Sequence, residues 1–286
     1  MGLVFAFIAL VGWGFGDFFI QRTTRVTGSE RALFFITAVG MILIFPFVRK
    51  DLATLGALNL LLLALVGIVM LFAALFDFEA LRQGKIAIIE PIMGIELPLT
   101  MALGITLGRD ILNAPQIILI FVIFIGIVLA VTSHHKQLHY HKRILEKGVI
   151  LAGVGAIGMA LTNFLVGVSS QNISPLVTVW FAHSLIAIIM GVLIAAKGEL
   201  PKLISDLRKH PGPIAGQSFL DNGAWVAFAF STTYIPLSIS TAITESYVAL
   251  AALLGILLNR EKLKKSQMVG VALALVGVII LSYFSS

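Results

Sequence analysis

The chain has 286 residues, of which 59% are hydrophobic and only 12% are charged. Its mean hydropathy of +1.03 is far above that of soluble domains, so the composition predicts an integral membrane protein. The absence of cysteine excludes disulfides, thiolate catalysis and cysteine-ligated metals. The formal net charge of +6 comes from basic residues in short loops beside apolar segments, so we expect lipid contact and no nucleic-acid partner.

Apolar segments follow one another along the whole chain, and each is long enough to cross about 30 Å of hydrocarbon as a helix. We expect ten spans, at residues 3–21, 32–48, 57–80, 86–107, 114–132, 148–168, 174–196, 213–233, 237–258 and 266–284. The first lacks the basic start and small-residue cleavage site of a secretory signal, so we count it as a span. The segments are too long and uniform for barrel strands, and the predicted fold class is an all-α membrane protein.

An internal repeat relates the two halves of the chain. A shift of 151 residues produces eight identities, which place Leu103, Gly104, Ile105, Leu107, Arg109, Leu112, Gln116 and Gly126 on Leu254, Gly255, Ile256, Leu258, Arg260, Leu263, Gln267 and Gly277. The chain is therefore expected to consist of two five-helix repeats, 1–133 and 148–286, joined by a polar linker at 134–147. Because five is odd, the repeats are inverted, an architecture of secondary transporters with a central substrate site.

The linker is the most polar stretch and contains His134, His135, His139 and His141. These side chains could ligate a metal, but no carboxylate or second shell accompanies them to orient the ligands. A solvated connector near the headgroups is the alternative that we favour, and we predict no metal and no cofactor.

The distribution of basic residues predicts the orientation in the cell membrane. The loops after spans one, three, five, seven and nine carry 17 Lys and Arg residues, and the opposite side carries three. The positive-inside rule places the basic loops in the cytoplasm and both termini outside.

Acidic residues occur inside the expected spans, whereas no Lys or Arg does. Seven of the 14 acids are placed there: Asp17, Asp77, Glu79, Glu90, Glu96, Asp221 and Glu245. An intramembrane charge costs about 2.5–3.5 kcal/mol on insertion scales, so such residues face a cavity, hold a proton or pair with a partner. Glu79 can pair with Arg82 on one helix face. For the other acids near the cytoplasmic face, hydration at the headgroups is the alternative.

Glu96 and Glu245 lie near the middle of spans four and nine, which correspond under the repeat, so we expect them at similar depth. Pro91 and Pro98 remove amide donors and are expected to release the carbonyls of Ala87 and Gly94. Released carbonyls in lipid need protein or a water-filled cavity, so span four is predicted to line one, with a packing kink as the alternative.

The candidate site follows from these residues. The substrate- or proton-binding candidates are Glu245, Glu96, Glu90, Asp17 and Asp221. The cavity-lining candidates are Trp13, Asn163, His183, Asn222, Thr241, Thr244 and Tyr247. The glycine pairs Gly12/Gly16 and Gly104/Gly108 predict close helix packing, either within the chain or between subunits, so the protein is a monomer or a homodimer.

The sequence resembles ten-span members of the drug/metabolite transporter superfamily with two EamA-type repeats. The matching residues are Trp13-Gly14, Ala80-Leu81-Arg82, Gly108-Arg109-Asp110 and Asn259-Arg260-Glu261-Lys262-Leu263. The resemblance implies a carrier of small metabolites, often an exporter, that works by alternating access around a cavity between the halves. The loops depart from the usual Gly-Glu, with Arg109 before Asp110 and Asn259 for the second glycine. Several members have cytoplasmic termini, opposite to the orientation predicted from the basic residues.

The sequence thus favours a non-enzymatic secondary transporter of a small metabolite or drug-like compound, with proton coupling through intramembrane carboxylates as one mechanism. A small-solute channel would be separated from a carrier by turnover rate and counterflow. A membrane-embedded lipid-modifying enzyme would need a nucleophile with its base or a metal set, and no such motif occurs within a span. The excess of acids favours a cationic, zwitterionic or neutral substrate over an anionic one.

Overall fold

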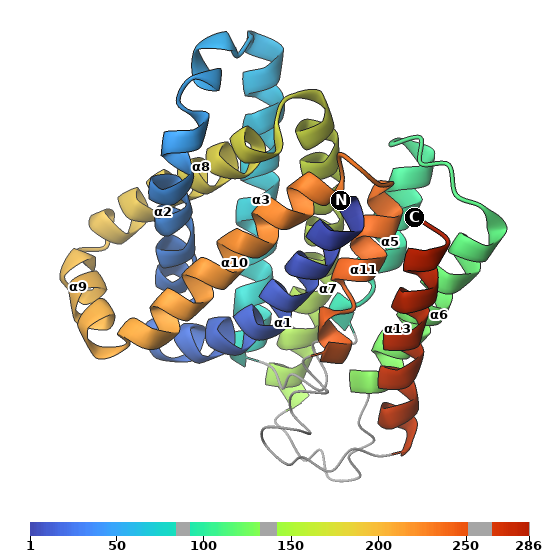
Figure 1. Cartoon of the computed structure of the whole chain (residues 1–286). Coiled ribbons are helices and arrows are strands. Elements are labelled where there is room, and N and C mark those ends of the chain that lie inside the picture. The colour runs from blue at the N-terminus through green and yellow to red at the C-terminus, as the bar shows by residue number, and fades with distance from the viewer. Residues whose placement is uncertain (84–91, 132–141, 251–264, 286) are drawn as a thin grey trace.

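The computed structural model describes residues 1–83, 92–131, 142–250 and 265–285, and within these ranges it contains helices and no strand (Figure 1). Length and composition allow six of the described helices to cross a membrane. They are α1 (Gly2–Thr27), α2 (Ser29–Val48), α3 (Ala57–Gln83), α7 (Lys142–Asn172), α8 (Pro175–Ala196) and α13 (Lys265–Tyr283). The other described helices are α5 (Glu96–Thr106), α6 (Ala114–Val131), α9 (Leu200–Lys209), α10 (Pro211–Ser231), α11 (Leu237–Thr244) and the 3₁₀ helix η1 (Asp51–Thr54). The prediction of an all-helical membrane protein is confirmed at this level.

The expected spans overlap described helices, but two of them are interrupted near their middle. In the fourth, a turn at Gly94 and Ile95 precedes α5. In the ninth, α11 ends at Thr244, a turn follows at Glu245 and Ser246, and residues 247–250 are helical again. Both interruptions put a carboxylate at a helix end in the interior of the protein.

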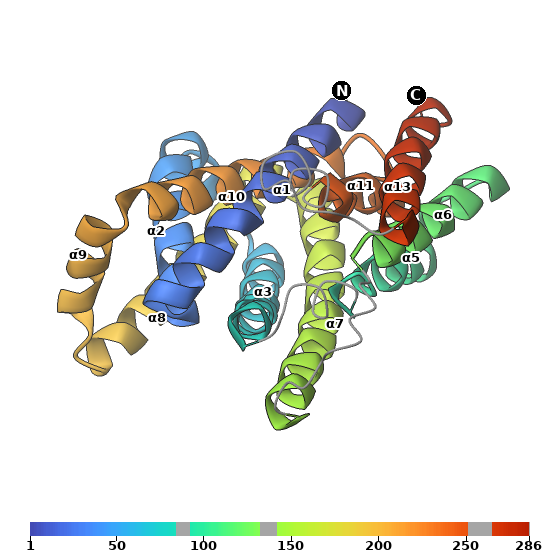
Figure 2. The ribbon, with the colours of Figure 1, turned by 90° about the horizontal axis from the view of Figure 1, so that it is seen from below.

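Helices from the two halves pack against each other. α1 lies along α10, α3 along α7, and α2 along α8, while α6 lies along α13 and α5 contacts α11 (Figures 1 and 2). Helices α1, α2 and α3 of the first half and α7, α8 and α10 of the second surround one apolar core, which includes Ile36, Met70 and Phe228. Helices α5, α6, α11 and α13, with the first part of α1, form a second core around Ile123 and Ile243. Each core is therefore built from both halves.

Glycines allow the closest of these contacts. A Cβ on Gly12 of α1 would lie 2.9 Å from the Cβ of Ala224 on α10. A Cβ on Gly126 of α6 would lie 2.6 Å from the backbone nitrogen of Ala274 on α13. Gly104 faces the start of α11, where its Cβ would lie 2.7 Å from the Ser238 hydroxyl. These glycines, including one from each predicted G-x-x-x-G spacing, therefore pack against helices of the same chain.

The segment expected to link the halves is only partly described. The four linker histidines, at positions 134, 135, 139 and 141, lie outside the described residues. Residues 142–147 begin α7, so this part of the linker is helical and continuous with the sixth expected span. The loop between the seventh and eighth expected spans also contains a helix, α9, that the hydropathy pattern did not predict.

Candidate functional site

A cavity lies where the two halves meet, beside the interruptions that precede α5 and follow α11. It contains about 730 Å³ of space free of atoms, part of it open to solvent. Its wall combines residues of α1, α2 and α3 from the first half with residues of α7, α8 and α10 from the second. The wall is therefore shared between the halves and does not belong to either one.

Carboxylates are the only charged side chains among the described residues of this wall. Five of them line the cavity: Asp17, Asp77, Glu96, Asp221 and Glu245. Glu96, Asp221 and Glu245 are each only 7% exposed. No Lys or Arg is among the described lining residues. Ionised carboxylates gathered in this way repel one another, so the arrangement favours occupation by protons or by a cationic group.

Glu96 and Glu245 are placed by the two helix interruptions. Glu96 is the first residue of α5, directly after the turn, and its carboxylate accepts a hydrogen bond of 2.5 Å from the side-chain amide of Asn163 on α7. Glu245 follows α11, and its backbone N–H donates to the carbonyl of Thr241 at 2.8 Å. Interrupted helices are tolerated within a membrane where they line a cavity, as they do here.

Two tryptophans stand beside two of the acids. α1 carries Trp13 and Asp17, and α10 carries Asp221 and Trp225, each pair separated by four residues and so on one helix face. The Trp13 and Trp225 rings meet edge to face with centroids 5.1 Å apart. The Trp13 side chain lies near Asp221, and the Tyr247 side chain lies near Asp17. The acids of α1 and α10 are thus held within an aromatic wall.

His183 on α8 has a defined partner on α10. Its Nδ1 lies 2.8 Å from the Oδ1 of Asn222, whose amide nitrogen donates to the carbonyls of Ile36 at 2.9 Å and Ser218 at 2.7 Å. These two carbonyl acceptors assign the amide nitrogen, so Oδ1 is the acceptor and Nδ1 of His183 carries hydrogen. In the neutral imidazole, Nε2 is then the unprotonated nitrogen, which can accept a hydrogen bond. Gly40 on α2 makes room for the pair, because a Cβ there would lie 2.0 Å from Oδ1.

Two stretches of the chain, residues 1–132 and 146–283, match the model of the EamA-like transporter family. The chain belongs to the EamA-like transporter family. A comparison with curated proteins found no significant match. One solved structure, described only as "Crystal structure of protein", superposes with a TM-score of 0.69 over 99% of this chain and 98% of that chain, at 13% identity. At that identity the likeness shows the fold alone, and the family match carries the assignment to transporters.

The structure brings most of the predicted site residues of this EamA-like chain to one wall. The residues so placed are Trp13, Asp17, Asn163, His183, Glu96, Asp221, Glu245 and Tyr247. Asn222, Thr241 and Thr244 are buried but are not among the lining residues. Asn222 holds His183, and the Thr244 hydroxyl donates to the Thr241 carbonyl at 3.1 Å. Glu90 and Pro91 lie outside the described residues.

Pro98 does not have the effect expected of it. It lies in the first turn of α5, where a backbone N–H has no partner within the helix in any case. The Gly94 carbonyl, which we expected Pro98 to release, accepts a hydrogen bond of 3.4 Å from the N–H of Leu97. The prediction of a free carbonyl at Gly94 is therefore wrong, and the chain turns before Pro98 is reached.

Asp77 is the lining carboxylate that sequence reasoning left out of the candidate site. It lies on α3 with Met70, Ala74 and Phe78, all of which line the cavity. Their spacing of four, seven and eight residues places them on one helix face, and this was the available signal. Glu79, two residues on, points elsewhere: it forms an ion pair of 2.6 Å with Arg82, which confirms that predicted pairing.

Proposed function

We propose that the chain is a secondary transporter that moves a small metabolite or drug-like compound across the cell membrane by alternating access. In this proposal it crosses the membrane ten times as two inverted repeats, with the basic loops in the cytoplasm and export as the direction. The membership in a transporter family supports the class of activity. The arrangement of the helices supports the mechanism.

The packing of the helices is consistent with a two-fold relation between the halves. The relation exchanges α1 with α7, α2 with α8, α3 with α10, α5 with α11 and α6 with α13. Under this exchange, the contact of α1 with α10 becomes that of α7 with α3. The contact of α3 with α8 becomes that of α10 with α2. All four of these helix contacts are present in the structure. The contacts of α2 with α8, α5 with α11 and α6 with α13 are unchanged by it. Related halves of this kind can rock about a shared central site.

The observation that carries the proposal is the cavity between the halves, with five carboxylates and no Lys or Arg among its described lining residues. A negative site of this kind favours a substrate with a cationic group, or protons that are exchanged for the substrate. The aromatic side chains of Trp13 and Trp225, which line the cavity with Asp17 and Asp221, also suit an organic ammonium group. We assign substrate or proton binding to Glu245 and Glu96 first, because each lies at a helix interruption.

The test uses proteoliposomes on a solid support, in which transient currents are recorded after a pH jump and after addition of amines, amino acids and drugs. Glu245→Gln and Glu96→Gln are expected to abolish the current while expression and thermal stability are retained. Glu30→Gln is the matched control, since Glu30 pairs with Lys197 on the surface. Full activity in both cavity variants would contradict the assigned roles. Tracer counterflow distinguishes the carrier, which shows it, from a channel, which does not.

A further inference from the structure

Helix α9 is a short helix on the rim of the protein. It begins four residues after α8 ends at Ala196 and ends two residues before α10 begins at Pro211. In both views it lies at the outer edge, on the opposite side of the molecule from α6 and α13 (Figures 1 and 2). Its ten residues span about 15 Å. Because it connects two helices of a membrane protein through such short links, it must lie close to the membrane boundary.

One face of α9 is apolar and uncovered. Leu200, Leu203, Ile204 and Leu207 fall within about 100° of the helix circumference at 100° per residue. Leu200 is 50% exposed, Ile204 58% and Leu207 50%, Leu203 is partly covered, and no residue of the helix is buried. A helix that packed this face against the protein would bury it. The face is therefore directed away from the rest of the described chain.

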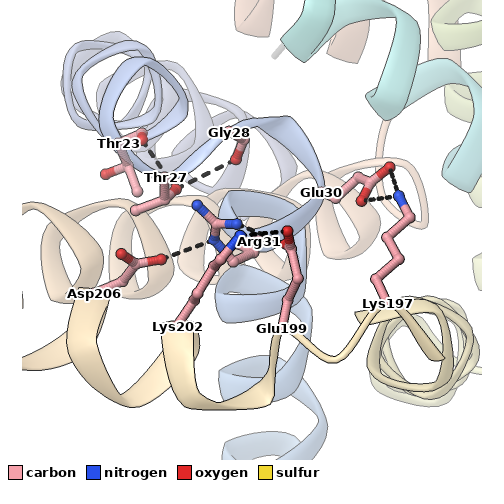
Figure 3. Close-up of polar contacts among 9 residues, drawn as sticks. All are labelled: Thr23, Thr27, Gly28, Glu30, Arg31, Lys197, Glu199, Lys202 and Asp206. Carbon is pink, nitrogen blue, oxygen red and sulfur yellow. Dashed lines mark hydrogen bonds and ion pairs between the residues drawn. The ribbon is translucent and has the colours of Figure 1, made fainter. Parts of the chain in front are cut away.

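The polar side of α9 is attached to the start of α2. Arg31 donates to Glu199 and to Asp206, both at 2.8 Å, and Lys202 forms an ion pair of 2.6 Å with Glu199 (Figure 3). Glu199 and Asp206 bracket the helix, one just before its first turn and one in its second half. Two attachment points along its length fix its rotation about its own axis. The apolar face is consequently held in place and cannot turn onto α2.

The attachment also neutralises the acids of this segment and leaves bases uncovered. Arg208 and Lys209 lie in the last turn of α9 and are exposed. Neither forms an ion pair with the residues that the structure describes. On the helical wheel Arg208 flanks the apolar face, and Lys209 lies on the side away from it. The helix thus presents leucine and isoleucine side chains next to positive charge.

We propose that α9 is an interfacial helix that binds an anionic lipid surface. Its apolar face enters the boundary between headgroups and acyl chains, and Arg208 and Lys209 contact anionic headgroups. The lipid-facing surface continues on both sides, since Val192 of α8 is 63% exposed and Phe219 of α10 is 61% exposed. A second copy of the chain is a poorer occupant, because four side chains cover far less than the roughly 800 Å² that each partner buries in a stable dimer.

The lack of cysteine in the natural chain makes a direct test available by spin labelling. Single cysteines are introduced by Ile204→Cys and Leu207→Cys on the apolar face and by Ser205→Cys on the polar side as the control. The full chain is labelled and placed in nanodiscs that contain phosphatidylglycerol. Oxygen, which partitions into lipid, is expected to relax the labels at 204 and 207 several-fold more than a water-soluble nickel chelate does, and the ratio reverses at 205.

Two outcomes would overturn the proposal. In one, the labels at 204 and 207 are as accessible to the nickel chelate as the label at 205, which places the face in water. In the other, they are shielded from both reagents and broadened by label-to-label coupling, which identifies a second copy as the occupant. All three substituted residues lack a hydrogen-bonded or ion-paired side chain among the described residues, so the labels leave the Arg31 attachment intact.

The preference for anionic lipid is tested separately with Arg208→Gln/Lys209→Gln in the Ile204→Cys background. When Arg208 and Lys209 are retained, the label at position 204 is expected to lie deeper in phosphatidylglycerol nanodiscs than in phosphatidylcholine nanodiscs. In the double variant this difference in depth is expected to be lost. Equal depth in the two lipids for the wild-type bases would overturn the anionic part of the proposal. Neither measurement uses transport activity, so the result is independent of the proposed substrate.

Discussion

The carboxylate of Asp110, in the loop after α5, accepts a hydrogen bond of 2.8 Å from the backbone N–H of Ser238 in the first turn of α11. It also accepts one of 2.7 Å from the Ser238 hydroxyl and one of 3.3 Å from the N–H of Leu237. An acid of the first half thus satisfies the free amides at the start of a helix in the second half. That helix carries Glu245 at its other end, so the loop acid helps to position a carboxylate of the cavity.

Removal of this contact is expected to destabilise the protein. Asp110→Ala should lower the free energy of unfolding by about 1–2 kcal/mol, because it leaves amides at the start of α11 without an acceptor. Asp110→Asn keeps one acceptor oxygen and should lose less. Thermal unfolding in detergent measures both, with the exposed Asp51→Ala as the control. An Asp110→Ala variant as stable as the wild type would contradict the capping role.

Gly40 should be irreplaceable at the contact between His183 and Asn222. In Gly40→Ala the new Cβ would lie 2.0 Å from Asn222 Oδ1 and 2.5 Å from His183 Nδ1, and both side chains are buried. We expect a loss of about 1–3 kcal/mol in the free energy of unfolding from the resulting overpacking. Gly153→Ala on α7 is the matched control, since its Cβ meets nothing within 4 Å. It should be neutral or gain up to about 1 kcal/mol from helix propensity.

Thermal unfolding of these two variants separates sterics from propensity. Equal behaviour of Gly40→Ala and Gly153→Ala would mean that the pair on α8 and α10 adapts to the added methyl group. A loss confined to Gly40→Ala, together with lower transport activity, would mean that the orientation of His183 in the cavity wall depends on this glycine.

Arg109 has a backbone φ of 60°, in the left-handed region that a residue with a side chain seldom adopts. Arg109→Gly relieves about 1–2 kcal/mol of that cost and loses about 0.4–1 kcal/mol through the greater entropy of the unfolded chain. A net gain between about 0 and 1.6 kcal/mol is expected in thermal unfolding. Arg109→Ala is the control, because alanine keeps the cost of the left-handed backbone conformation. An equal gain in stability in Arg109→Ala would mean that the gain comes from loss of the arginine side chain and not from relief of the backbone.

The hydropathy pattern predicted the helical segments well because lipid-crossing helices are long and uniformly apolar. It failed for α9, whose four apolar residues alternate with charged ones and average to a polar loop; only their spacing at 200, 203, 204 and 207 marks a helix. The interruption before α5 was expected from Pro98, although the turn comes earlier. The turn after α11 consists of Glu245 and Ser246 and contains neither proline nor glycine, so the local sequence did not predict this interruption.

The grouping of the candidate site residues was predictable to the extent that it depends on their depth in the membrane. The repeat relates the spans of Glu96 and Glu245, and the cost of an intramembrane charge singled out Asp17 and Asp221. Asp77 was missed because the direction that it faces depends on how α3 packs, and that packing joins segments far apart in the sequence. The contact of His183 with Asn222 beside Gly40 involves three helices for the same reason.

The attachment of α9 is expected to depend on pH through Glu199. Hydrogen bonds from Lys202 and then from Arg31 lower the pKa of the Glu199 carboxyl below its usual value of 4.5. Because the folded-state pKa is the lower one, the stabilisation is complete above the unfolded value and is lost as the pH falls through the folded value. We therefore expect attachment to be constant between about pH 8 and pH 5 and to weaken only below pH 4.5.

The mobility of a spin label at Ser205→Cys reports this attachment. Glu199→Gln should raise the mobility at neutral pH, because the amide keeps the shape of the carboxyl but loses the charge that holds Arg31 and Lys202. Glu30→Gln is the control: it makes the same chemical change on α2, where Glu30 pairs with Lys197, and leaves the Arg31 contacts in place. If mobility rose in both variants alike, or if the wild type loosened well above pH 5, the attachment would have to rest on groups other than Glu199.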